Sequence, residues 1–336
     1  TALLMLPWAS ASGEGAPWLT ALFTSTSAVC VTGLVVVDTG TYWSPLGQGL
    51  VMALFQLGGF GMMTSATLMG LLIGGHMKLR TRLLLQSETH ALSLGDVRSV
   101  ARMVLVVTVV VEGGVALWLA ARFAITMGLG WREALWQGAF HSVSAYNNAG
   151  FSTWPDSVMR HVTDGWVLAP LMLAIVVGGL GFPVITELWA NRGKRHTRWS
   201  VHTTLTVWGS VALVAGGTLA LWLVEHDNPK TMGALGVVDQ WLAALFTSVS
   251  ARTAGFNAVD IGALAHESWA LHYLLMFIGG GSAGTAGARP HLEATAALLR
   301  EVASRHAGGR LLSVLEGGYN PRGLATAVSA HMTAMA

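Results

Sequence analysis

One short motif occurs three times in this chain and constrains its architecture more than any other feature. The copies read FTSTSAVCVTGL at 23–34, FHSVSAYNNAGF at 140–151 and FTSVSARTAGF at 246–256. Each runs from an aromatic residue through a Ser-Ala pair to a glycine and a large apolar residue. Self-similarity at a long interval indicates a repeated structural unit. We therefore expect related units that carry equivalent glycines at Gly33, Gly150 and Gly255.

Long apolar runs separate the motifs. Only 11% of the residues are charged, whereas a soluble domain carries about 25%. So few charges cannot cover a surface that faces water, and the lipid bilayer is the expected solvent. A helix needs about 20 apolar residues to cross a bilayer. Runs of this kind predict spans at 46–73, 100–125, 167–189, 205–224 and, shorter, 269–281.

Basic residues gather in two of the connections between these runs, at 76–102 and at 191–199, and the connections on the other side are acidic or mixed. Cytoplasmic loops carry an excess of lysine and arginine. The pattern predicts a multi-pass protein of the cell inner (plasma) membrane with both basic loops in the cytoplasm. Membrane lipid is its expected surroundings, and we expect no nucleic-acid partner. Cys30 is the one cysteine, so no intrachain disulfide can form.

Each motif ends an apolar segment of half the usual length, at 17–29, 131–146 and 238–251. Such a segment fits a helix that enters the membrane, stops midway and returns as extended backbone, which is tolerated where it lines a watery cavity. Rings of backbone carbonyls replace the water of a crossing ion, and glycine permits the required backbone angles. The alternative is glycine turns that pack ordinary helices. The expected ion-lining residues are Val31, Thr32, Gly33, Asn148, Ala149, Gly150, Thr253, Ala254 and Gly255.

A second glycine cluster follows each motif, as LGGFGMM, GGLGFP and FIGGGSAGTAGA. The first two are compatible with close packing of helices. The third is too rich in glycine to hold a stable helix and predicts a break in the last span. The residues of this break are Gly279, Gly280, Gly281, Ser282, Ala283, Gly284, Thr285, Ala286 and Gly287.

The stretches TSTSAVCVTGLVVVDTG, HSVSAYNNAGF, TSVSARTAGFN and MFIGGGSAGTAG resemble the TrkH/KtrB family of bacterial potassium uptake proteins over about 1–287. The resemblance implies an all-α polytopic membrane protein, not an enzyme, built from helix–pore loop–helix units around one pore. It implies a selectivity filter at the ion-lining residues, a gate at 279–287, and K⁺ as the transported ion with no cofactor. It also implies a homodimer and a cytosolic nucleotide-binding regulatory subunit of the TrkA/KtrA type.

Three of the family's four units can be placed, the first and third incomplete. We assign 1–75 to the first pore unit, 76–97 to a cytoplasmic loop, 98–190 to the second unit, 191–199 to a further loop, 200–287 to the third unit and 288–336 to a tail.

The tail has the composition of a short soluble α/β segment. Its SVLEGGYN resembles the end of the histone-deacetylase-like amidohydrolases, whose transition-state tyrosine would correspond to Tyr319. That chemistry requires zinc, and no zinc-ligand cluster precedes the tail. We interpret the change at about 288 as an accidental fusion, which would make this a truncated, chimeric copy that either is inactive or still transports. A zinc-dependent hydrolase fragment confined to the tail, or a polytopic transporter of another solute, are the alternatives.

Four polar residues remain to be interpreted, and for two of them there are two alternatives. Arg252 is either an electrostatic tether of the third half-length helix or a surface residue of an outer cavity. Glu112 lies in an apolar span, where a carboxylate is a functional candidate or pairs with a polar neighbour. Asn147 and Asn148 are expected to brace the second loop through their side-chain amides.

Overall fold

The computed structural model describes residues 1–76, 96–192, 199–281 and 285, and the structure of these residues is helical. The helices are α1 (Trp18–Val29), α2 (Thr39–Tyr42), α3 (Pro45–His76), α5 (Asp96–Met127), α6 (Trp131–Tyr146), α7 (Gly165–Leu180), α8 (Phe182–Ala190), α9 (Val201–Glu225), α10 (Val237–Ser250) and α11 (His266–Ile278). Among the same residues, the 3₁₀ helices η1 (Ala2–Met5) and η2 (Pro7–Ala9) precede α1, and η3 (Met159–His161) and η4 (Ile261–Ala263) lie in later connections. No strand occurs in these ranges, which agrees with the predicted all-α fold.

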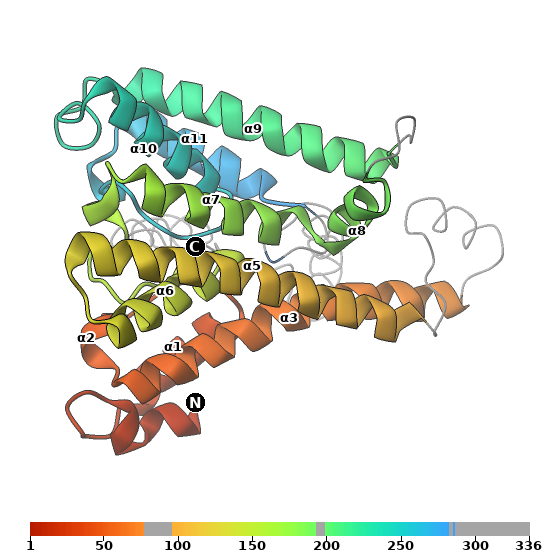
Figure 1. The fold of residues 1–336 in the computed structure, drawn as a ribbon, viewed down its shortest axis with the longest axis horizontal. Coiled ribbons are helices and arrows are strands. Elements are labelled where there is room, and N and C mark those ends of the chain that lie inside the picture. Colours follow the sequence, from red (N-terminus) through yellow and green to blue (C-terminus); the bar gives the residue numbers. More distant parts are fainter. Residues whose placement is uncertain (77–95, 193–198, 282–284, 286–336) are drawn as a thin grey trace, which may run out of the picture.

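The long helices α3, α5 and α9 cross the whole molecule, and the short helices α1, α6 and α10 lie toward one end of it (Figure 1). The connections through α2 and η3 are at that same end. The C-terminal end of α3, the N-terminal ends of α5 and α9, and α8 lie at the opposite end. The chain therefore places the elements that flank the two basic segments together, away from the short helices.

Each short helix packs against a long one. Helix α1 contacts α3, α6 contacts α5 and α7, and α10 contacts α9 and α7. Aromatic rings fill the space between the first two of these pairs, since Phe55 of α3 lies 5.7 Å from the rings of both Phe140 and Phe151. Phe55 of α3 thus packs against both α6 and the loop that follows it.

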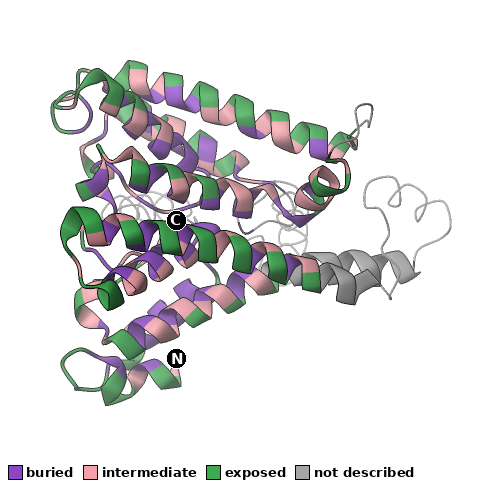
Figure 2. Cartoon of the chain, in the orientation of Figure 1, coloured by how far each residue is buried: buried purple, intermediate pink, exposed green. Residues whose placement is uncertain are grey.

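The outer sides of α5 and α9 carry many exposed residues (Figure 2), and several of these are large and apolar. Val110 and Leu117 of α5 and Leu205 and Trp208 of α9 are among the exposed residues. Within the described residues, Arg102–Met127 and Val201–Glu225 are long and apolar enough to cross a membrane. The pair α7–α8 would be a third span if its two halves are taken together. Exposed apolar faces of this size are expected for helices that contact lipid.

The prediction of one continuous span at 167–189 is wrong, because the chain breaks between α7 and α8 and turns by 97°. Gly181 at the break has φ 87°, a conformation that favours glycine. Pro183 follows and lacks the amide hydrogen that a continuous helix would use. The glycine cluster GGLGFP therefore bends the span, where the sequence suggested packing of helices.

The last span ends early, as its glycine content predicts. Helix α11 stops at Ile278, and Gly279 has φ 63°. Of the predicted break, Gly279, Gly280, Gly281 and Thr285 are described, and Ser282, Ala283, Gly284, Ala286 and Gly287 lie outside the described residues. The tail 288–336 with Tyr319 and most of both basic loops also lie outside them, so the predicted domain boundaries stay predictions.

Candidate functional site

Three loops of closely similar backbone follow the short helices α1, α6 and α10. In each loop two residues with positive φ flank one without it. The φ values are 56° at Val31 and 71° at Gly33, 54° at Asn148 and 69° at Gly150, and 74° at Thr253 and 81° at Gly255. Positive φ is uncommon for residues other than glycine, above all for the β-branched valine and threonine. Strained backbone of this kind persists where the surrounding structure imposes it, and it is concentrated at functional sites.

The three glycines meet. A Cβ on Gly150 would lie 2.8 Å from Gly255 Cα and 2.9 Å from Ala254 O, and a Cβ on Gly255 would lie 2.9 Å from Gly150 Cα. The Cβ position of Gly33 is taken by the carbonyl oxygen of Ala149, with Gly150 Cα 3.4 Å away. Segments that are about 105 and 117 residues apart in sequence are therefore in backbone contact through their glycines.

Side-chain amides hold the second loop. Asn147 Nδ2 donates to Gln56 Oε1 of α3 at 2.6 Å and to Glu112 Oε1 of α5 at 3.1 Å. Asn148 Nδ2 donates to Thr285 Oγ1 at 2.7 Å. Both Nδ2 groups donate within the protein, as a brace requires. Glu112 pairs with a polar neighbour, which is the simpler of its two interpretations.

The glycine-rich segment after α11 lies against the break in α7 and against the second loop. Gly281 N donates to Gly179 O at 2.7 Å and Thr285 N to Gly178 O at 3.0 Å. Thr285 Oγ1 donates to the carbonyl of Tyr146, the last residue of α6, at 2.9 Å. A single threonine thus joins this segment to both the helix and the loop of the second motif.

Arg252 connects the third loop to the same segment. Its Nε donates to Gly279 O at 3.0 Å and its Nη2 to Ser210 Oγ of α9 at 2.9 Å. The side chain is buried, so its interpretation as a surface residue of an outer cavity is wrong. A cation near the C-terminal end of α10 interacts favourably with that helix dipole. The position was noticed in the sequence, but its acceptors belong to distant segments and could not be inferred.

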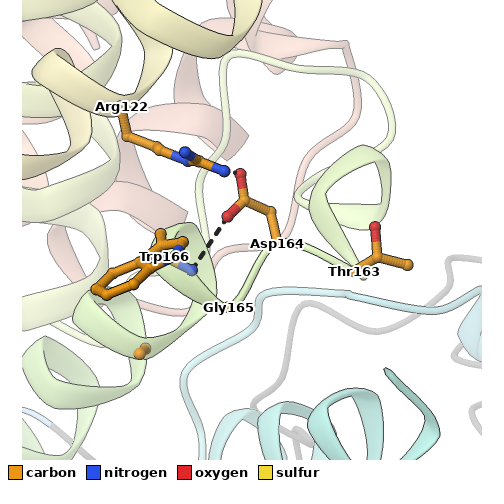
Figure 3. Close-up of a pocket in the computed structure, with 6 residues that line it drawn as sticks. Arg122, Thr163, Asp164, Gly165 and Trp166 are labelled. Atoms are coloured by element: carbon orange, nitrogen blue, oxygen red, sulfur yellow. Dashed lines mark hydrogen bonds and ion pairs between the residues drawn. The ribbon is translucent and has the colours of Figure 1, made fainter. Parts of the chain in front are cut away.

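A cavity of about 600 Å³ lies between α5 and the start of α7 (Figure 3). Arg122 and Asp164 line it and form an ion pair at 3.0 Å, and Asp164 also accepts from Trp166 N at the start of α7. None of the nine predicted ion-lining residues lines this cavity. The ion pair of Arg122 and Asp164 joins α5 to the start of α7.

No group of three or more histidine, cysteine, aspartate or glutamate side chains gathers to hold a metal ion within the residues that can be placed. The zinc chemistry suggested by the resemblance of the tail therefore has no support among them.

Comparison with known proteins agrees with the resemblance seen in the sequence. The model of the TrkH family, described as a cation transport protein, matches residues 3–295. The Ktr system potassium uptake protein B of Bacillus subtilis is 39% identical over 284 residues, which are 84% of this chain and 62% of that protein. The protein of the same name from Vibrio alginolyticus is 39% identical over 285 residues, with 85% and 62% covered. The potassium/sodium uptake protein NtpJ of Enterococcus hirae is 33% identical over 291 residues, also with 85% and 62% covered.

The fold is similar to the crystal structure of the potassium transporter TrkH from Vibrio parahaemolyticus, with a TM-score of 0.61 at 18% identity over 95% of this chain and 63% of that one. The chain spans about 62% of the length of the first curated relatives it matches. Because the family model covers most of its residues, the chain belongs to the TrkH family of cation transport proteins.

Proposed function

We propose that potassium ions cross the membrane through a filter formed by the loops after α1, α6 and α10. The observation that carries this proposal is the shared backbone: positive φ recurs at two positions of every loop, and the loops meet at Gly33, Gly150 and Gly255. Backbone that alternates between left- and right-handed angles can direct successive peptide groups to one side, whereas in a regular strand they alternate between sides. Three such loops around one axis would line it with carbonyl oxygens.

Carbonyl oxygens suit a dehydrated alkali cation. They replace its hydration shell with neutral dipoles, so the ion can enter and also leave. The C-terminal ends of α1, α6 and α10 directly precede the loops, and the negative end of each helix dipole adds attraction for a cation. Relatives named for potassium uptake support K⁺ as the ion, and one named for potassium and sodium makes selectivity the property to measure.

The segment 279–287 is proposed as the gate. Its hydrogen bonds to the second loop, through Thr285, and to the third, through Arg252, support this role. A gate bonded to the filter would respond to its conformation.

A homodimer in the cell inner membrane is also proposed, with the basic segments 76–102 and 191–199 in the cytoplasm, where a nucleotide-binding regulatory subunit would contact them. Helix α8 and the N-terminal ends of α5 and α9 flank these segments and lie at the same end of the molecule (Figure 1). This arrangement supports a common side of the membrane for both segments.

Rubidium uptake tests the function. The protein is produced in bacterial cells that lack their own potassium uptake systems, and uptake of ⁸⁶Rb⁺ is measured with K⁺ or Na⁺ as competitor. We expect uptake that K⁺ suppresses more strongly than Na⁺, and its loss in Gly255→Ala, where a Cβ would meet Gly150 Cα at 2.9 Å.

Gly209→Ala is the matched control, because this glycine of α9 has no atom within 4 Å of its Cβ position. No uptake by the wild-type protein, or equal uptake and selectivity in Gly255→Ala, would contradict the filter. Transport of another solute would then be the remaining explanation for the fold.

A further inference from the structure

One serine in each motif binds the far end of its own loop. These serines belong to the Ser-Ala pair that recurs in all three copies of the motif. The hydroxyl donates to the carbonyl oxygen of the residue that follows the glycine: Ser27 Oγ to Leu34 O at 2.7 Å, Ser144 Oγ to Phe151 O at 2.7 Å, and Ser250 Oγ to Phe256 O at 2.6 Å. The same contact therefore closes every loop.

The backbone of the same serine holds the middle of the loop. Its carbonyl accepts from the amide of the residue before the glycine: Thr32 N to Ser27 O at 2.9 Å, Ala149 N to Ser144 O at 2.8 Å, and Ala254 N to Ser250 O at 2.9 Å. Each loop is thus fastened twice to one residue of its helix, on either side of the glycine.

The pattern survives a change in loop length. The serine and the residue after the glycine are seven positions apart in the first two motifs and six in the third. If the bond depended only on the number of residues between serine and carbonyl, the loop that is one residue shorter would lose it. Its retention in the shorter loop indicates that the hydroxyl-to-carbonyl contact is itself required.

The three serines are buried, so water cannot replace the hydrogen bonds of their hydroxyl groups. Ser144 and Ser250 are 0% and 1% exposed and Ser27 is 5% exposed. A serine hydroxyl inside a helix commonly bonds to the carbonyl one turn earlier in that helix, but these three reach forward into the loop. A buried carbonyl without a partner carries the full cost of its desolvation. Removing the serine hydroxyl therefore destabilises the present position of the loop end and leaves that end free to move.

We infer that Ser27, Ser144 and Ser250 are positioning residues of the filter, and this inference rests on the proposed function. Each hydroxyl turns the carbonyl after the glycine into the protein, so that oxygen is withheld from the ion and the far end of the loop is fixed. A loop held at that point cannot close around the smaller sodium ion as readily as a free one. The three serines therefore determine selectivity without contacting the ion.

The chain contains matched controls two residues earlier in the same helices. Ser142 Oγ donates to Glu112 O of α5 at 2.7 Å and Ser248 Oγ to Val214 O of α9 at 3.0 Å. Both serines are fully buried. Replacing them removes one hydrogen bond of the same kind from the same helices and leaves the loop contact intact.

The test compares Ser144→Ala and Ser250→Ala with Ser142→Ala and Ser248→Ala in the rubidium uptake assay, with K⁺ and Na⁺ as competitors. We expect the preference for K⁺ over Na⁺ to fall about fivefold in the first pair, the factor that corresponds to about 1 kcal/mol for one hydrogen bond. The control pair should keep the wild-type preference. Unchanged preference in the first pair, or an equal fall in both pairs, would overturn the inference.

A second measurement judges the contact without transport. Phenylalanine labelled with ¹³C at its carbonyl reports on Phe151 by solid-state NMR of the protein in lipid. One carbonyl signal should shift in Ser144→Ala and remain in place in Ser142→Ala; no shift in Ser144→Ala would show that the bond is absent. If the wild-type protein takes up no rubidium, the proposed function is refuted, and the carbonyl signal alone decides whether the serine holds the loop.

Should Ser144→Ala fail to reach the membrane, Ser27→Ala is compared with Ser25→Ala, whose hydroxyl donates to Leu22 O of its own helix at 3.0 Å and lies 2.8 Å from Thr1 Oγ1, away from the loop. Leucine labelled in the same way then reports on Leu34.

Discussion

Gly150 should be the position in the second loop that is least tolerant of a methyl group. The substitution Gly150→Ala has two separate costs in the free energy of folding. The φ of 69° at this position costs an L-residue about 1–2 kcal/mol. A Cβ would also lie 2.8 Å from Gly255 Cα and 2.9 Å from Ala254 O. Both neighbours are backbone atoms that cannot rotate away, and overpacking of this kind costs about 1–3 kcal/mol. Together they lower the free energy of unfolding by about 2–5 kcal/mol.

Two other glycines separate these costs. Gly128 has φ 65° and nothing within 4 Å of its Cβ position, so Gly128→Ala should lose only the conformational part, about 1–2 kcal/mol. Gly216 lies within α9, also with nothing within 4 Å, and Gly216→Ala should gain about 0.5–1 kcal/mol.

The assay is reversible unfolding of the purified protein in mixed micelles with increasing dodecyl sulfate, followed by circular dichroism, together with rubidium uptake. The order Gly150→Ala, Gly128→Ala, Gly216→Ala should run from least to most stable, with uptake lost only in the first. If Gly150→Ala costs no more than Gly128→Ala, the crowding of the loops is refuted.

Three further predictions concern buried polar groups. The carboxylate of Glu225 accepts hydrogen bonds from Asn228, Thr231, Ser268 and the amide of Ala265. Glu225→Ala should therefore lower the free energy of unfolding by about 3 kcal/mol or more, and Glu225→Gln, as a milder control, should lower it less. Equal stability of the wild-type protein and Glu225→Ala would contradict this. Arg252→Met should cost about 1–3 kcal/mol in the same titration because it leaves two buried oxygens without a donor; a cost near zero would mean that the bonds are unimportant. Burial lowers the pKa of His161 below its ordinary value of 6.5, so its contribution to stability is present above pH 6.5 and is lost as the pH falls through the lower folded-state pKa. In melting curves between pH 4 and 8, His161→Phe should weaken this dependence, and an unchanged slope would contradict the assignment.

The positions of the short helices were predictable from sequence. The expected segment 131–146 coincides with α6, and 17–29 and 238–251 differ by one residue or less at each end from α1 and α10. The reason is that each helix lies between clear local signals, a proline or glycine before it and the glycine motif after it. The repeat also suggested that the three glycines occupy equivalent places.

Other features depend on contacts between distant segments and left no local signal. Val31 and Thr253 adopt positive φ although β-branched residues disfavour it, so propensity argues against what the neighbouring loops impose. The break before Gly181 is bonded to the segment after α11, since Gly281 N donates to Gly179 O and Thr285 N to Gly178 O. These partners are more than 100 positions apart in the sequence. The burial of Arg252 likewise follows from acceptors on α9 and after α11. The Ser-Ala pair was visible as a repeat, but only coordinates reveal that its hydroxyl reaches across the glycine.

Under the proposed function, backbone oxygens of the three loops bind a dehydrated alkali cation on one axis. Crystals of the protein grown in rubidium chloride, with diffraction recorded at the rubidium absorption edge, test it most directly. We expect anomalous density on the axis beside Gly33, Gly150 and Gly255, and its loss when sodium replaces rubidium. Rubidium density elsewhere in the protein, with none between the three loops, would contradict it.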